Sequence, residues 1–302
     1  MRIILVGQGA FAEQVFDGLR ERGHAVAAVY CPPDSGTRLD PVKARAVALG
    51  IPVRQHRSLK TPVVQREFAD LRSTLGVLAY VTQIVPESVF ATPRLGSICF
   101  HPSLLPRYRG GSAINWQIIK GETKGGVSVF WVDRGIDTGP LLLQKPAAIG
   151  PDDTAGSLYY KTLFPLGVDA VLEAVDLVAA GTAPRVPQDE TQASYDPLCR
   201  NEHAAVDWSR PPREVYNLIR GCDPQPGAYA VFRGEKLRLY EARLLTGRRS
   251  RPGVVLEITA EGILIGAGEG AVRVKRVRFG DKKVDAVEFA ASSGLQTGVR
   301  FG

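Results

Sequence analysis

The sequence predicts an α/β domain built on an open, mostly parallel sheet, followed by a second, smaller β-barrel domain. In the first half, apolar runs such as Ile3–Val6 and Ala25–Tyr30 alternate with stretches of helical periodicity. Parallel strands need crossover helices between them, so this alternation is typical of a Rossmann-like sheet. In the last third, short alternating runs are separated by glycine and proline, which is typical of a small antiparallel barrel resembling an OB fold.

The first strand, Ile3–Val6, leads into the segment GQGAFA, and a helix then runs to about Arg22 and ends at Gly23. The segment resembles the dinucleotide fingerprint G-x-G-x-x-A, which also requires an acidic residue at the end of the next strand to bind the ribose. That strand ends in Val-Tyr-Cys instead. We therefore expect a structural strand-to-helix turn and no NAD site.

The next elements carry clear boundary signals. Asp40 followed by proline is a typical helix start, and the helix should continue to Leu49. Residues Val63–Thr74 have a helical pattern, and the apolar run Val77–Val81 predicts a buried strand.

A histidine and an aspartate follow two further predicted strands. His101 comes directly after Ser97–Phe100, and Asp137 lies in a glycine-bounded turn after Val127–Val132. Open α/β sheets bind ligands at the carboxyl ends of their strands. Because a histidine exchanges protons near neutral pH and a carboxylate can orient it, the pair favours acyl transfer or hydrolysis. A capping histidine and a turn aspartate are the structural alternative.

The loop after His101, PSLLPRYRGG, is forced by its two prolines and two glycines. Ser112 can cap a helix over Ala113–Ile119. A longer helical pattern covers Ala155–Ala180, and Pro165 should kink or divide it.

The chain is expected to divide into a catalytic domain at residues 1–181, a linker at 182–204 and the small barrel at 205–302. The linker is inferred from a stretch rich in Pro, Gln, Thr and Ser that has little periodicity. The barrel domain should contain a helix over Pro212–Arg220 and five strands, at Ala228–Phe232, Lys236–Leu244, Gly253–Ile258, Gly262–Gly266 and Ala271–Phe279.

Composition is that of a soluble globular protein, with 44% hydrophobic and 23% charged residues among 302. No apolar run approaches the roughly 18 residues needed to cross a bilayer, and the N-terminus reads as a strand rather than a signal peptide. The four cysteines are widely spaced without a CxxC motif. We therefore expect a cytoplasmic protein with free thiols, no metal site and no membrane association.

The net charge of +7 is compatible with an anionic ligand or a nucleic acid. The densest basic clusters, Arg248–Arg251 and Arg273–Lys283, are interpreted as solvated surface.

The motifs HPSLLPRYRGGSAINW and GGVSVFWVDRGIDTGPLLLQ resemble the folate-dependent formyltransferase family. The similarity extends from MRIILVGQGAFAEQVF to the RPGVV segment, and it is strongest to the amino-terminal hydrolase domain of 10-formyltetrahydrofolate dehydrogenases. Methionyl-tRNA formyltransferases are more distant. The resemblance implies that His101 and Asp137 are catalytic and that 10-formyltetrahydrofolate is the co-substrate.

Position 99 departs from the family pattern. The family has an asparagine two residues before the histidine, which helps to polarise the formyl oxygen, whereas this chain has Cys99. Because the hydrolase domain of the dehydrogenases also lacks that asparagine, the departure favours the hydrolase-like branch. Cys99 could itself accept the formyl group as a thioester, although a buried free cysteine is usually a small hydrophobe.

The resemblance also implies that Gln83, Ile84 and Val85 grip the folate. A flat pteridine would fit a slot between three strand ends, with apolar side chains over its faces. Tyr80 could stack on it or belong to the core, and Arg107 and Arg109 could either hold the loop or bind the glutamate tail. The candidate folate contacts are Tyr80, Gln83, Ile84, Val85, Leu104, Arg107 and Asp133.

Formyl transfer from 10-formyltetrahydrofolate to an amine or to a carrier-bound acceptor is the predicted reaction. Hydrolysis to formate and tetrahydrofolate is the alternative. Methionyl-tRNA is a less favoured acceptor, because the segment Pro33–Asp40, where a basic insert is expected, contains only Arg38. A separate carrier protein as partner and a non-enzymatic folate-binding protein are the remaining interpretations.

Overall fold

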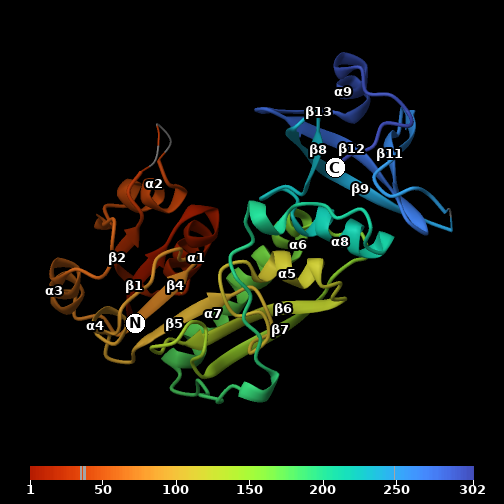
Figure 1. Cartoon of the computed structure of the whole chain (residues 1–302). Helices are drawn as coiled ribbons and strands as arrows, with labels where there is room; N and C mark the ends of the chain where they lie inside the picture. Colours follow the sequence, from red (N-terminus) through yellow and green to blue (C-terminus); the bar gives the residue numbers. More distant parts are fainter. Residues whose placement is uncertain (35, 37–38, 248) are drawn as a thin grey trace. The chain divides into compact units, whose positions relative to one another are not determined.

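The structure is a computed structural model that describes residues 1–34, 36, 39–247 and 249–302. The chain forms two compact units. The first comprises Met1–Gly111, Gly126–Ala147 and Lys161–Tyr195, and the second comprises Ser112–Gly125, Ala148–Tyr160 and Asp196–Gly302. Each unit is built around a sheet of its own (Figure 1).

The sheet of the first unit has seven strands in the order β3-β2-β1-β4-β5-β6-β7. Strands β3 to β5 pair in parallel, whereas β6 runs antiparallel to β5. The mostly parallel, Rossmann-like sheet is thus confirmed. The strands are β1 (Arg2–Gly7), β2 (Ala25–Cys31), β3 (Val53–Gln55), β4 (Leu75–Ala79), β5 (Ser97–His101), β6 (Lys124–Trp131) and β7 (Leu141–Ala148).

Helices bury both faces of this sheet, which is why its central strands β1, β2 and β4 are apolar over nearly their whole length. On one face, Ile4 and Val6 belong to a buried cluster with Phe68 of α3 and Val89 of α4. On the other face, Phe11 of α1 packs against Phe100 of β5 and Phe164 of α7. The helices are α1 (Gly9–Glu21), α2 (Pro41–Ala48), α3 (Pro62–Asp70), α4 (Glu87–Phe90) and α7 (Phe164–Ala179).

Most of the predicted helices and strands form close to the expected residues, and the differences have local causes. Asp40 caps α2 by accepting a hydrogen bond from the amide of Val42 at 3.0 Å. The helix expected over Val63–Thr74 ends at Asp70, because the chain already enters β4 at Leu75.

The helical stretch after residue 155 is divided before Pro165, as expected. The first piece, α6 (Ala155–Leu158), passes into a π-helical turn, Tyr159–Leu163, before α7 begins at Phe164. Proline has no N–H to continue the regular hydrogen-bond ladder, so the irregular turn lies just ahead of it.

The helix α5 (Ala113–Ile119) forms at the expected residues, but Ser112 does not cap it with its side chain. Its hydroxyl oxygen instead accepts a hydrogen bond from the amide of Cys199 at 2.9 Å. The second unit also contains α8 (Pro212–Gly221), α9 (Ala286–Ser293) and the short 3-10 helix η3 (Asn201–His203).

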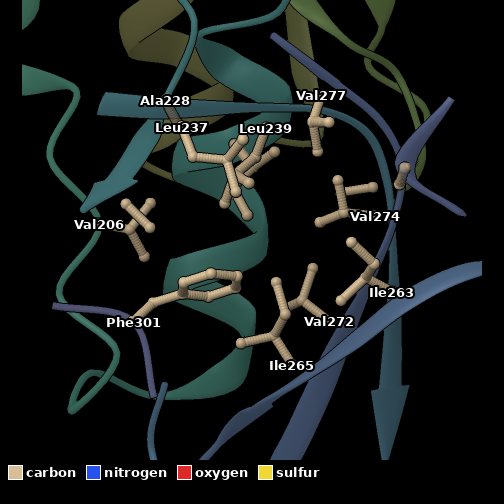
Figure 2. Close-up of a cluster of buried hydrophobic side chains, with 14 of the residues drawn as sticks. Val206, Ala228, Leu237, Leu239, Ile263, Ile265, Val272, Val274, Val277 and Phe301 are labelled. Carbon is tan, nitrogen blue, oxygen red and sulfur yellow. The ribbon is translucent and has the colours of Figure 1, made fainter. Parts of the chain in front are cut away.

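The second unit contains a six-stranded antiparallel sheet in the order β10-β11-β12-β9-β8, with β13 added to β12. The five expected strands are all present, while β13 and α9 were not predicted. Alternate residues of β9, β11 and β12 enclose a core that Phe301 closes near the C-terminus (Figure 2). The strands are β8 (Tyr229–Phe232), β9 (Glu235–Thr246), β10 (Val255–Thr259), β11 (Gly262–Ala267), β12 (Gly270–Phe279) and β13 (Lys282–Asp285).

The stretch interpreted as a linker is divided between the two units. Residues 182–195 belong to the first unit, where Leu141 and Val186 exchange backbone hydrogen bonds of 2.7 and 3.0 Å. The same stretch contains the 3-10 helix η2 (Glu190–Gln192). It shows no apolar period because it is held by backbone groups and polar side chains.

Candidate active site

His101, the last residue of β5, is buried and has both ring nitrogens near oxygen atoms. Its Nε2 lies 2.7 Å from the carbonyl oxygen of Tyr108. A carbonyl can only accept, so Nε2 carries a hydrogen and donates it. Its Nδ1 lies 3.5 Å from Oδ2 of Asp137. Nδ1 is therefore the ring atom at which a proton can be gained or lost.

Asp137 lies in the turn after β6 with a positive φ of 57°. Its Oδ2 accepts a hydrogen bond from the amide of Gly110 at 2.8 Å, in addition to facing His101. The two residues therefore lie close together as predicted, but not because their strand ends share an edge. Trp131 at the end of β6 pairs with Ile98 near the start of β5, so the turn after β6 must return toward His101.

The turn sequence Gly-Ile-Asp-Thr-Gly has a steric explanation. Asp133 accepts hydrogen bonds from the amide of Gly135 at 3.0 Å and the hydroxyl of Thr138 at 2.7 Å. A Cβ atom at Gly135 would lie 2.0 Å from Thr138 Oγ1, and one at Gly139 would lie 1.7 Å from the carbonyl oxygen of Trp131. Asp133 and the two glycines thus fix the turn that presents Asp137.

The loop after His101 is tied to the sheet by Ser128, which lies opposite His101 in the β5–β6 pairing. The Ser128 hydroxyl donates to the carbonyl of Ser103 at 2.6 Å and accepts from the amide of Leu105 at 3.1 Å. Gln144 of β7 donates to the same hydroxyl oxygen at 2.9 Å. Both serines are fully buried, so the loop has an internal polar anchor.

Residues 186–195, which we call the clamp segment, connect the histidine loop to the aspartate turn. The amide nitrogen of Gln188 donates to the carbonyls of Asp137 and Gly139, both at 2.8 Å. Its amide oxygen accepts from Nη2 of Arg109 at 2.8 Å. A single side chain therefore bridges both halves of the candidate site.

The clamp segment also holds the residue that orients His101. Ser194 accepts from the amide of Tyr108 at 2.8 Å, and its carbonyl accepts from the amide of Arg109 at 2.9 Å. Gln188, Glu190 and Ser194 were not among the predicted site residues, because their polar, aperiodic surroundings are typical of a linker.

Arg109 has a structural environment. Its guanidinium forms two hydrogen bonds to Glu190, at 2.7 and 2.9 Å. The hydrogen bond raises the pKa of Arg109 and lowers that of Glu190. The Arg109 side chain is 8% exposed and that of Glu190 is 67% exposed, so the pair sits at the rim of the loop.

Cys99 pairs with Phe130 in the β5–β6 ladder. Burial, and to a smaller extent the carboxylate of Asp137, raise the pKa of its thiol. A thiol that stays protonated at neutral pH is a poor nucleophile. The environment therefore favours a small apolar residue beside Asp137 over a thioester-forming one.

Two of the seven candidate folate residues contribute to one small pocket. Tyr80 and Gln83 line a pocket at the carboxyl ends of β1, β2 and β4, but its volume of 20 Å³ is close to that of one water. The side chains of Tyr80 and Ile84 are 45% and 64% exposed. The lining of this pocket, taken over the described residues, does not include Ile84, Val85, Leu104, Arg107 or Asp133.

Gln83 has an unusual feature for a pocket residue. Its amide nitrogen donates to the carbonyl of His56 at 3.2 Å, while its Oε1 is buried without a hydrogen-bond partner. Buried acceptors are rarely left unpaired, so this oxygen suits a ligand donor such as a pteridine amino group.

The GQGAFA turn holds an internal carboxylate. The amide of Gly9, at the start of α1, donates to both oxygens of Asp40, at 2.9 and 3.1 Å. A pyrophosphate bound at this helix end would need that N–H and would meet a negative charge. The arrangement favours the structural interpretation of the motif.

The described residues contain no group of three or more His, Cys, Asp and Glu side chains placed to hold a metal ion. They also contain no helix that is both long and apolar enough to cross a membrane.

Comparison with known proteins assigns both parts of the chain. A formyl transferase family model matches residues 1–175, and a model of the formyl transferase C-terminal domain matches residues 199–294. The chain is 39% identical to the cytosolic 10-formyltetrahydrofolate dehydrogenase of Mus musculus, over 98% of this chain and 35% of that protein. It is 37% identical to the methionyl-tRNA formyltransferase of Geobacter metallireducens, over 100% of this chain and 99% of that enzyme.

Solved structures support the fold. HypX from Aquifex aeolicus in complex with tetrahydrofolic acid matches with a TM-score of 0.72 at 22% identity, covering 100% of this chain and 50% of that one. An N-formyltransferase from Helicobacter canadensis, in complex with folinic acid and dTDP-3-aminofucose, matches with a TM-score of 0.70 at 18% identity, covering 90% and 98%. The chain spans about a third of the dehydrogenases that it resembles. It belongs to the formyl transferase family.

Proposed function

We propose that this protein transfers the formyl group of 10-formyltetrahydrofolate to an amine or to a carrier-bound acceptor. The observation that carries the proposal is the 3.5 Å approach of His101 Nδ1 to Asp137 Oδ2, with the opposite ring nitrogen committed to Tyr108. The names of the dehydrogenase relatives and the tetrahydrofolate complex of HypX support a folate co-substrate.

The direction of the Nε2 hydrogen bond defines the role of His101 in this mechanism. When the ring is neutral, Nδ1 has a lone pair and cannot donate. The imidazolium form has an Nδ1–H, which donates to the formyl oxygen as negative charge develops on it. The contact to Asp137 is longer than the roughly 2.7–2.9 Å of a strong charged hydrogen bond, so a formyl oxygen can share that proton.

Asp137 acts on the nucleophile. The amine or water attacks the formyl carbon, and the carboxylate takes the proton that the nucleophile loses. The tetrahedral intermediate then collapses, the bond between the formyl carbon and N10 breaks, and N10 takes up the proton that Asp137 received, which returns the carboxylate to its starting form. The amide of Gly110 fixes Oδ2 throughout. Loss of one oxyanion donor typically lowers kcat about 10²–10³-fold.

Folate binding requires a rearrangement around the small pocket. Gln83 offers its unpaired oxygen, and Tyr80 and Ile84 offer exposed apolar surface for the pteridine faces. Because the pocket measures only 20 Å³, these side chains must move aside before a pteridine can enter. We propose that the remaining candidates lie beside the opened slot or support the residues that line it. These candidates are Val85, Leu104, Arg107 and Asp133.

Two other reactions are kept as alternatives. Hydrolysis is favoured by Cys99, which leaves the site without the side-chain donor that an asparagine would supply. Methionyl-tRNA as acceptor is favoured by the end-to-end similarity to the Geobacter enzyme. Arg38, on which the argument against tRNA depended, lies outside the described residues.

The test is incubation with 10-formyltetrahydrofolate alone, with amino sugars, with a pantetheinylated carrier protein, and with methionyl-tRNA. Tetrahydrofolate, formate and the formylated acceptor are measured together. His101→Ala and Asp137→Asn should each lose about 10²-fold or more in rate, whereas Asp169→Asn, on the exposed face of α7, should not. Formate alone would identify a hydrolase. A His101 or Asp137 variant of near-normal rate would remove that residue from the chemistry.

A further inference from the structure

The second unit contains a polar pocket of about 580 Å³ that the formyl-transfer mechanism does not use. Its lining includes three arginines, Arg200, Arg238 and Arg278, and one acidic residue, Glu202. A volume of this size is within the range of small-molecule sites, and the charge balance of the lining favours an anion.

Arg238, on β9, is fixed in place by neutral acceptors. Its Nη1 donates to the carbonyls of Pro226 and Gly227, both at 2.9 Å, and its Nη2 donates to Oδ1 of Asn201 at 3.0 Å. The guanidinium is therefore oriented without a carboxylate to neutralise it. Because the side-chain oxygen of Asn201 is used in this way, its NH₂ group remains as a further donor.

A second cation lies directly across the sheet. The β9–β12 register places Arg278 opposite Arg238, and the β12–β13 register places Lys283 on its other side. Like charges that face each other across strands are destabilising. Lys283 has partial compensation from Glu241 at 3.8 Å and from the ring of Tyr240.

Two other arginines of the same sheet are paired with carboxylates. Arg273 of β12 pairs with Glu257 and Glu261, and Arg243 of β9 pairs with Asp152 at 2.7 Å. Over the described part of the chain, none of the three pocket arginines forms an ion pair with a carboxylate. Arg276 of β12, outside the pocket lining, donates to the carbonyl of Lys283 and likewise has no carboxylate partner among the described residues.

We propose that this pocket binds a small organic phosphate. Two facing arginines match the charge of a phosphate dianion, and the guanidinium fork matches its oxygens. The pocket is larger than an isolated phosphate ion, and Glu202 can accept a hydrogen bond from a hydroxyl or amino group of the same ligand. The inference does not depend on the proposed formyl transfer.

Cys199 provides a local reporter of occupancy. It lines the pocket, and its Sγ lies 3.9 Å from that of Cys222. The hydrogen bond from Cys222 lowers the pKa of the Cys199 thiol. Because thiolates are the reactive form, alkylation of Cys199 should be measurable, and a bound ligand should slow it.

The experiment uses the full chain with ribose 5-phosphate, glucosamine 6-phosphate and inorganic phosphate at constant ionic strength, and with ribose and chloride as controls. Calorimetry gives affinity, and iodoacetamide labelling of Cys199 gives protection. We expect the sugar phosphates to bind and to protect. Arg238→Gln and Arg278→Gln should each weaken binding by about tenfold or more, the cost of one lost charge-assisted hydrogen bond.

Arg243→Gln is the matched control, because it removes the same charge from β9 at a paired position outside the pocket lining. Arg278→Lys preserves the charge if Arg278→Gln does not fold, and it should still weaken binding because lysine lacks the fork. Equal weakening by Arg243→Gln, protection by ribose, or no binding of any sugar phosphate would overturn the proposal. Binding of tRNA without binding of small phosphates would overturn it as well.

Discussion

Arg109 in the first unit and Arg238 in the second are both oriented by several hydrogen bonds, but their charges are treated differently. Arg109 donates to the carboxylate of Glu190 and to Gln188. Arg238 donates to two backbone carbonyls and an asparagine. The first guanidinium is neutralised by the protein, whereas the second retains its charge.

The difference separates an arginine that builds a site from one that can bind a ligand. Neutralised and almost buried, Arg109 connects the histidine loop to the clamp segment, and of the two roles expected for it the contacts favour holding the loop. Arg238 is also oriented by several hydrogen bonds, but its positive charge is not neutralised and faces a pocket. The number of hydrogen bonds does not distinguish the two arginines. The charge of their acceptors does, because Arg109 donates to a carboxylate and Arg238 donates only to neutral oxygens.

The strongest test of the first region is Gln188→Leu. It removes the donors to the carbonyls of Asp137 and Gly139 and the acceptor of Arg109. We expect kcat to fall by about 10²-fold with little change in KM, because small misplacements of catalytic groups have effects of that size. Gln192→Leu, on the exposed part of η2, is the control. Steady-state kinetics of both variants would contradict the clamp role if Gln188→Leu kept a normal kcat.

Arg109→Met should lower stability by about 2 kcal/mol, because it leaves Gln188 without its donor in a nearly closed loop. Glu190→Gln should have a smaller effect because Glu190 is largely exposed. The hydrogen bond from Arg109 lowers the pKa of Glu190, so its contribution is present above the usual range for glutamate and is lost as pH falls through the lowered value. Urea denaturation of both variants at neutral and acidic pH measures their free energies of unfolding. Equal losses of stability in the two variants would contradict the smaller effect expected for the exposed Glu190.

Cys99→Ala separates packing from covalent catalysis. Because burial raises the pKa of the Cys99 thiol, we expect kcat to change by less than about fivefold, against the 10²–10³-fold expected for an oxyanion donor. Cys99→Asn would add a side-chain donor and should shift the products from formate toward formylated amine. Near-complete inactivation of the alanine variant, with unchanged melting temperature, would instead support a thioester.

The smallest effect expected is a difference among thiols. The pKa of Cys199 is lowered, whereas burial raises the pKa of Cys31 to about 11 and raises that of Cys99. A lower pKa means a larger thiolate fraction at pH 7.5, so Cys199 should be alkylated first. Mass spectrometry after brief iodoacetamide treatment gives the order. Faster labelling of Cys99 would indicate that its strand end is more open than the structure indicates.

Local sequence signals were sufficient for much of the fold. The alternation of strands and helices, the cap at Asp40, the break before Pro165 and five strands of the second unit all follow from periods and propensities within a few residues. Among the missed elements, α9 has eight residues, whereas β3, α4 and β13 have only three or four each. Three or four residues are too few for a period to be recognised, which accounts for β3, α4 and β13 but not for α9.

The sequence by itself determined which groups the chain offers, an imidazole and a carboxylate that each follow a predicted strand. Because β6 runs antiparallel to β5, a shared sheet edge does not bring the two groups together, and the turn after β6 does so in the folded chain. Tertiary structure alone decided which nitrogen of His101 can gain a proton, that Gln188 bridges to Asp137 from 51 residues away, and that Ser194 holds Tyr108 from 86 residues away. It also decided that Arg238 and Arg278 face each other, with no carboxylate among the described residues forming an ion pair with either. These features depend on contacts between distant segments, and no local pattern of residues specifies which polar groups will meet.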